Sequence, residues 1–215
     1  MSEALLVSLL LAFSGGFQDA YTYVVRDHVF ANAQTGNIVL LSQNLVERDW
    51  SMVLHYLVPL VFFAMGIVAA EGIRQKYKNV QKIHWRQLVL LMEMILLLLV
   101  GFLPEKLNLL ANAMVSFACA MQVQTFRKMG GYSYASTMCI GNLRSGTAAF
   151  SHYLQDKKTE QLKQAAYYFG IIFLFAIGAG LGGNLTEHFG IHMIWISCVL
   201  LVISFLLMFE EGKER

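Results

Sequence analysis

The chain has 215 residues, of which 57% are apolar and only 14% are charged. Soluble domains average about 45–50% apolar and about 25% charged residues, so this composition excludes a soluble globular protein and predicts an integral membrane protein. The formal net charge of +2 gives no indication of nucleic-acid binding. Cys119, Cys139 and Cys198 lie in apolar runs without metal-binding or CxxC spacing, which predicts buried free thiols.

A membrane-spanning helix needs about 20 mainly apolar residues. The first apolar run has the length of a signal peptide, but it lacks a basic beginning and continues to Val25, so we interpret it as a membrane helix. In chain order, the segments that qualify as spans are 4–25, 53–73, 86–103, 106–127, 164–184 and 190–209. Two shorter and more polar segments, 30–46 and 134–153, determine the topology because they either cross the membrane or do not.

These two polar segments carry related motifs. The first contains Phe30-Ala31-Asn32-Ala33-Gln34-Thr35-Gly36-Asn37, and the second contains Tyr134-Ala135-Ser136-Thr137-Met138-Cys139-Ile140-Gly141-Asn142. A glutamine precedes the motif glycine by 18 positions in the first copy, at Gln18, and by 19 in the second, at Gln122. Further along, Ala64-Met65-Gly66 corresponds to Ala176-Ile177-Gly178. We therefore predict two homologous repeats, 1–103 and 104–215, within one membrane domain.

The distribution of basic residues indicates how often the chain crosses the membrane. If the two polar segments do not cross, 13 of the 16 basic residues lie on the same side as the termini, and only Arg26, Arg48 and Lys106 lie on the other. The 13 are Arg74, Lys76, Lys78, Lys82, Arg86, Arg127, Lys128, Arg144, Lys157, Lys158, Lys163, Lys213 and Arg215. Eight spans would remove this bias, so the positive-inside rule favours six spans with both termini in the cytoplasm.

An odd number of spans in each repeat reverses the orientation of the second repeat. The predicted fold is therefore an all-α polytopic membrane bundle of two inverted three-span repeats, each with a re-entrant or broken polar segment. Irregular backbone at membrane depth is tolerated where it is buried in protein or lines a wet cavity. Inverted repeats with broken helices near the midplane recur among transporters.

The motifs also resemble a known family. Gly16-Phe17-Gln18-Asp19-Ala20, then Phe30 with Thr35-Gly36-Asn37, then Gln122 and Gly141-Asn142 are similar to the YoaK-like family of bacterial inner-membrane proteins, a domain of unknown function. The resemblance covers essentially the whole chain and implies a multi-pass protein of the bacterial inner membrane. The chain departs from the family pattern at Ile140, which corresponds to Thr35, and at Val123-Gln124, where Gln-Asn is usual.

Three charged residues within the predicted spans or the polar segments are candidates for function. Asp19 and Glu93 are carboxylates within predicted spans, where ionised groups are costly and are expected to face the bundle interior or water. Asp19 is interpreted either as a proton or cation site or as a structural acceptor that holds the first polar segment. Arg144 is either a partner or anion contact in the second segment or a snorkelling interfacial residue. For Glu71, an interfacial pair with Arg74 is preferred.

The Gly-Asn pairs have two interpretations. Asn37 and Asn142 would suit the start of a half-helix whose N–H groups face an anion or polar solute, or they cap a helix or clamp a loop. Gly178 and Gly182, matched by Gly66 and Ala70, predict close helix packing. His188 and His192 lack a third ligand, so no metal site is expected.

The sequence favours a small-solute or ion transporter or channel-like protein, with a non-transporting membrane scaffold or interaction protein as the alternative. An enzyme is not expected, because no GxSxG, HExxH or P-loop motif accompanies the carboxylates. No cofactor is expected, and the expected partners are the lipid bilayer and a small solute or ion, with a homo-oligomer left open. The candidate pathway residues are Gln18, Asp19, Asn32, Gln34, Thr35, Gly36, Asn37, Glu93, Gln122, Gln124, Gly141, Asn142 and Arg144.

Overall fold

The fold is a helical bundle, seen here in a computed structural model that describes residues 2–78, 84–129, 132–133 and 136–213. Lys82, Tyr134, Ala135 and Arg215, which the sequence analysis used, lie outside these ranges. The α-helices are α1 Ser2–Val25, α2 Gln34–Glu47, α3 Trp50–Tyr77, α4 Trp85–Val100, α5 Asn108–Thr125, α6 Cys139–Asp156, α7 Thr159–Phe189 and α8 Trp195–Lys213. Short 3-10 helices cover η1 Glu105–Leu107 and η2 Ile191–Ile194, and strands β1 Lys128–Met129 and β2 Tyr132–Ser133 form one antiparallel pair. The predicted helical class is confirmed.

Each of the six predicted spans forms a helix, and the two polar segments form α2 and α6. Three segments in the described part of the chain are individually long and apolar enough to cross a membrane: Trp50–Tyr77, Thr159–Phe189 and Ile191–Met208. Large apolar side chains on their outer faces, such as Val68 and Phe173, are exposed. A bilayer would cover such side chains, so the arrangement is that of a membrane protein.

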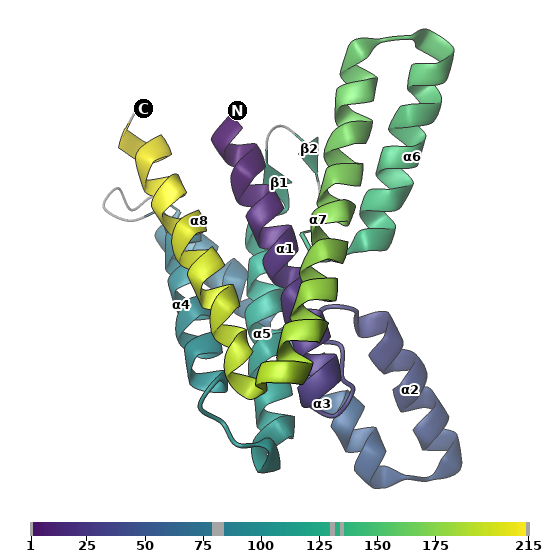
Figure 1. Ribbon diagram of the computed structural model, residues 1–215, viewed down its shortest axis with the longest axis vertical. Coiled ribbons are helices and arrows are strands. Elements are labelled where there is room, and N and C mark those ends of the chain that lie inside the picture. The colour runs from purple at the N-terminus through teal and green to yellow at the C-terminus, as the bar shows by residue number, and fades with distance from the viewer. Residues whose placement is uncertain (1, 79–83, 130–131, 134–135, 214–215) are drawn as a thin grey trace.

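The bundle is built on two close helix pairs, α1 with α7 and α3 with α5 (Figure 1). Glycines allow both approaches: an added Cβ at Gly178 would collide with the backbone carbonyl of Phe13, and one at Gly66 with that of Phe117. Small residues let helix backbones approach when there is no apolar driving force between helices in lipid. The close packing predicted for these glycines is confirmed.

The helices run between two ends of the molecule, which Figure 1 shows at the top and the bottom. Both termini lie at the upper end, here called the terminal end, together with the α6–α7 connection, the end of α3 and the beginning of α4. The α2–α3 and α4–α5 connections lie at the opposite end. Helices α2 and α6 each begin about half way along the molecule and run to different ends. Ala31 and Asn32 ahead of α2, and Ser136 and Thr137 ahead of α6, are buried.

Arg26 has a structural role that the sequence analysis did not predict. Its side chain is fully buried, and its guanidinium donates to the Tyr21 hydroxyl, to Asn108 Oδ1 at 2.8 Å, and to the carbonyls of Val100 and Leu103. These acceptors include carbonyls at the end of α4, which have no partner within the helix. Arg26 therefore ties the end of α1 to the α4–α5 connection, a role that composition and charge bias do not reveal.

Candidate functional site

The segments that precede α2 and α6 meet beside Gly15 of α1. The Asn32 side-chain amide donates to the Gly15 carbonyl at 3.1 Å. A Cβ added at Gly15 would collide with the Thr137 side chain and would lie 3.9 Å from Asn32 Nδ2. Asn32 and Thr137 belong to the two repeated motifs, so the motifs approach each other through the residues ahead of their Gly-Asn pairs.

Asp19 fixes the first of these segments. Its carboxylate is buried, and Oδ1 accepts from the Asn32 backbone N–H at 2.7 Å. Asn37, one turn into α2, closes the same segment from the other side: Oδ1 accepts from the Phe30 backbone N–H at 3.2 Å, and Nδ2 donates to the Phe30 carbonyl at 2.7 Å. It also donates to Gln34 Oε1 at 2.9 Å. This geometry matches the structural alternatives for Asp19 and Asn37, a loop acceptor and a loop clamp.

Gln122 of α5 holds the second segment. Its amide donates to Ser136 Oγ at 2.9 Å and to the Leu11 carbonyl at 3.4 Å. Asn142 is buried at the beginning of α6, as Asn37 is at the beginning of α2. Each polar segment is therefore anchored by a polar side chain from a neighbouring helix, Asp19 in one case and Gln122 in the other.

A third contact brings in Glu93 of α4. Glu93 is fully buried, and its Oε1 accepts from Gln18 Nε2 at 3.4 Å. Gln18 also accepts from the Cys119 thiol at 2.9 Å and donates to Ser14 Oγ at 3.0 Å. Cys119 also lies within interaction range of Asn32. Three helices and the segment before α2 thus contribute to one continuous polar region.

Several oxygen atoms in this region have no hydrogen-bond partner among the described residues. We call the region the central polar cluster; it consists of Gln18, Asn32, Glu93, Cys119, Gln122 and Thr137, together with Ser116, which lies one turn before Cys119 on α5. The atoms without a partner are Asn32 Oδ1, Glu93 Oε2, Ser116 Oγ, Gln122 Oε1 and Thr137 Oγ1, all buried. Buried polar atoms are almost always hydrogen-bonded. The amide and carboxylate oxygens can bind a cation or accept from a solute, and the Ser116 and Thr137 hydroxyls can accept or donate.

Some predicted pathway residues lie away from this cluster. Thr35, Gly141 and Arg144 are exposed on α2 and α6. Since successive helical residues are rotated by about 100°, the inward positions of Asn37 and Asn142 turn these neighbours outward. Gly36 packs against the ring of Phe30, and Gln124 binds Glu71 at the terminal end.

Other members of the cluster were not predicted. Ser116 and Cys119 were overlooked because small polar residues are common in membrane helices, and Cys119 was interpreted only as a buried thiol. Thr137 belongs to the second motif but was not selected. The spacing gives a signal: Ser116, Cys119 and Gln122 recur every three residues along one face of α5.

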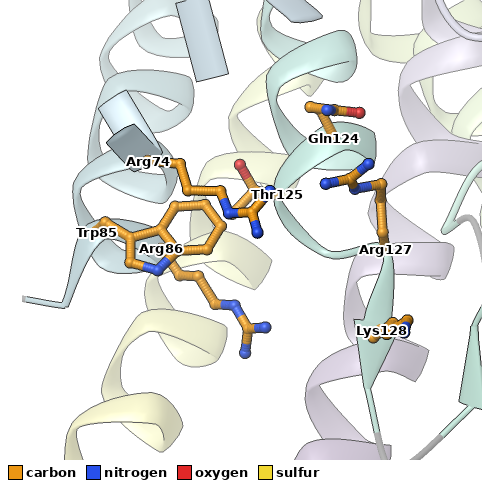
Figure 2. Close-up of a pocket in the computed structure, with 7 residues that line it drawn as sticks. All are labelled: Arg74, Trp85, Arg86, Gln124, Thr125, Arg127 and Lys128. Atoms are coloured by element: carbon orange, nitrogen blue, oxygen red, sulfur yellow. The ribbon is translucent and has the colours of Figure 1, made fainter. Parts of the chain in front are cut away.

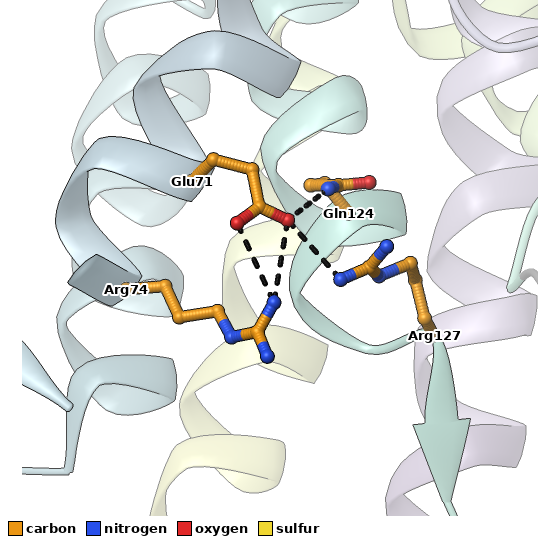
Figure 3. A network of polar contacts seen from close by, with 4 residues as sticks. All are labelled: Glu71, Arg74, Gln124 and Arg127. Atoms are coloured by element: carbon orange, nitrogen blue, oxygen red, sulfur yellow. Dashed lines mark hydrogen bonds and ion pairs between the residues drawn. The ribbon is translucent and has the colours of Figure 1, made fainter.

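A second feature is a basic pocket of 410 Å³ at the terminal end, between α3, the start of α4 and the end of α5 (Figure 2). It is lined by Arg74, Trp85, Arg86, Gln124, Thr125, Arg127 and Lys128. Glu71 lies between two of the arginines, 3.4 Å from Arg74 and 3.1 Å from Arg127, and also accepts from Gln124 (Figure 3). The predicted Glu71–Arg74 pair is confirmed, whereas Arg127 comes from the segment between α5 and β1.

Comparison with known proteins places the chain in a family. Residues 7–207 match the family described as "Protein of unknown function (DUF1275)". The chain is 25% identical over 201 residues to the UPF0700 transmembrane protein YoaK of Bacillus subtilis (strain 168), an alignment that covers 89% of this chain and 88% of that protein. No solved structure matches the chain. Because the match spans nearly the whole sequence and agrees with the resemblance of the motifs, this chain belongs to the DUF1275 family.

Proposed function

We propose that the protein is a transporter or channel-like protein for a small solute or ion, and that the central polar cluster is its binding site. The observation that carries the proposal is the set of buried oxygen atoms without a described hydrogen-bond partner, two of which, on Asn32 and Thr137, lie where the two motif segments meet. An unpaired buried polar group costs about 1–3 kcal/mol. A bound cation, or a solute with N–H or O–H groups, would remove that cost.

The supporting architecture is that of two inverted repeats, 1–103 and 104–215. Under this proposal α1 to α4 correspond to α5 to α8, and the pairing of α1 with α7 corresponds to that of α5 with α3. Gly66 against Phe117 and Gly178 against Phe13 are then equivalent contacts. The opposite directions of α2 and α6 in Figure 1 also support the inversion. Such repeats place a solute site at their interface.

Glu93 is the residue we propose to carry charge during transport. Its Oε2 has no described partner, whereas Asp19 already holds the Asn32 backbone N–H. A carboxylate in a protein interior within the bilayer is costly unless it is neutralised by a proton or a cation. Glu93 therefore suits reversible binding better than Asp19 does.

The test is cation flux in vesicles that contain the purified chain. We expect Glu93→Gln to reduce proton or alkali-cation flux at least tenfold, because the amide has the shape of the carboxylate without its charge. Glu187→Gln is the matched control, since Glu187 is exposed on α7 and far from any described contact with the cluster. Flux should remain at the wild-type level in this control.

The alternative function, a non-transporting scaffold, is supported by the well-made bonds of Asp19, Asn37 and Arg26, which shape the bundle without any solute. Vesicles with wild-type protein would then show no more flux than empty vesicles. Equal flux in the wild type and Glu93→Gln would remove Glu93 from the mechanism.

A further inference from the structure

We propose that the basic pocket at the terminal end binds a phosphate-bearing anion, at a site separate from the central polar cluster. Four cationic side chains line it: Arg74, Arg86, Arg127 and Lys128. Its volume of 410 Å³ lies in the range of small-molecule sites, roughly 300–1,000 Å³. A simple row of snorkelling residues would not enclose such a space.

Two of the cationic side chains in the pocket pair with Glu71. Glu71 lies between Arg74 and Arg127, whose side chains are 46% and 52% exposed. Ion pairs at such exposure contribute little, so they leave the guanidinium groups available to a second anion. Arginine also presents a planar fork of donors that matches phosphate oxygens. Figure 3 shows both arginines converging on Glu71, Arg74 from α3 and Arg127 from the segment between α5 and β1.

An independent observation is the hydroxyl of Thr125. Thr125 lines the pocket but is only 3% exposed, and its Oγ1 has no hydrogen-bond partner among the described residues. A threonine hydroxyl donates well to a phosphate oxygen. A buried donor beside several cationic groups is the arrangement that an anion site requires, and it is unexpected at a surface that only meets water.

The aromatic wall places the pocket at the level of lipid headgroups. Trp85 begins α4 and lies against Arg86, whose Cζ is 5.6 Å from the ring centroid (Figure 2). Tryptophan favours the membrane–water interface, and clusters of Lys and Arg beside membrane helices bind anionic lipids. The phosphate can therefore belong to a lipid headgroup or to a soluble phosphate compound, and the chemistry of recognition is the same.

The experiment measures binding to the purified full chain in a neutral detergent. One arm titrates inorganic phosphate at constant ionic strength against chloride and follows the thermal unfolding temperature. The other arm adds phosphatidylglycerol or phosphatidylcholine and counts bound lipids by native mass spectrometry. If only phosphate stabilises the protein, the ligand is a soluble anion. If only phosphatidylglycerol is selectively retained, the ligand is a lipid headgroup. Either result supports an anion site in the pocket.

The variants test the pocket itself. We expect Arg86→Gln to weaken binding about tenfold and Thr125→Val to weaken it several-fold. Arg86→Lys should bind with an affinity between those of Arg86→Gln and the wild type, because lysine keeps the charge but lacks the planar fork of guanidinium donors. Lys158→Gln is the control, since Lys158 is an exposed cation at the α6–α7 connection. Unliganded unfolding temperatures verify that each variant is folded. The proposal is overturned if neither phosphate nor phosphatidylglycerol binds, or if folded pocket variants bind as the control does.

Discussion

Asp19 illustrates how a buried charge in a membrane helix can serve the fold. Its Oδ1 accepts from the Asn32 backbone N–H at 2.7 Å, so the carboxylate holds the segment that leads into α2. Glu93, in the same polar region, has one oxygen without a described partner. The two buried carboxylates thus have different hydrogen-bond partners, which distinguishes Asp19 as an anchor of the fold from Glu93 as a candidate binding group.

We predict that Asp19→Asn keeps stability and flux close to those of the wild type, because an amide oxygen still accepts from Asn32. Asp19→Leu should lower the free energy of unfolding by about 1–3 kcal/mol, because it leaves that N–H unpaired. Thermal unfolding in detergent and flux in vesicles measure the two effects. Loss of flux in a stable Asp19→Asn would instead assign the charge itself to transport.

At the scale of whole helices, the contact between α1 and α7 requires glycine only on the face of α7 that is turned towards α1. Gly178 faces α1, where a Cβ would meet the carbonyl of Phe13, whereas Gly180 is exposed with nothing within 4 Å of an added Cβ. Backbone atoms cannot move aside as a side-chain end can. Alanine substitutions at Gly178 and Gly180 therefore separate the effect of helix–helix packing on stability from the effect of helix propensity.

We predict that Gly178→Ala destabilises the protein by about 1–3 kcal/mol, the usual cost of overpacking. Gly180→Ala should be neutral or stabilise by up to about 1 kcal/mol, since alanine is the better helix former. Reversible unfolding in mixed micelles compares the pair directly. Equal stability of the two variants would mean that α1 and α7 are not in backbone contact.

Across the whole molecule, the chain connections divide between the two ends. The end of α3, the beginning of α4 and the α6–α7 connection lie at the terminal end with both termini (Figure 1). The α2–α3 and α4–α5 connections lie at the opposite end. Most of the basic residues in the sequence belong to the first group. The positive-inside rule therefore predicts that the terminal end faces the cytoplasm.

We predict that Arg48→Cys and Lys106→Cys react with an impermeant thiol reagent in intact cells. Lys78→Cys and Lys158→Cys should react only after permeabilisation, because they lie at the terminal end. The background replaces the natural cysteines, of which Cys119 is buried and free. Labelling of Lys158→Cys from outside would require α2 and α6 to cross the membrane completely and would restore eight spans.

The sequence by itself determined the membrane class, the positions of the helices and the glycine contacts. These properties depend on composition, on apolar runs and on small residues at helical spacing, all of which are local. It also pointed to Gln18, Asn32, Glu93 and Gln122, because polar residues within apolar runs are costly unless they face the interior.

Only the tertiary structure decided which polar residues meet and which are already satisfied. Thr35, Gly141 and Arg144 belong to the motifs yet turn outward, since a helix rotates its neighbours away from one another. Arg26 has the charge of a surface residue but is buried because Asn108 and the last carbonyls of α4 surround it. In the basic pocket, Arg74 and Arg127 both pair with Glu71, and no local pattern encodes a contact between Glu71 and Arg127, which lie so far apart in the chain.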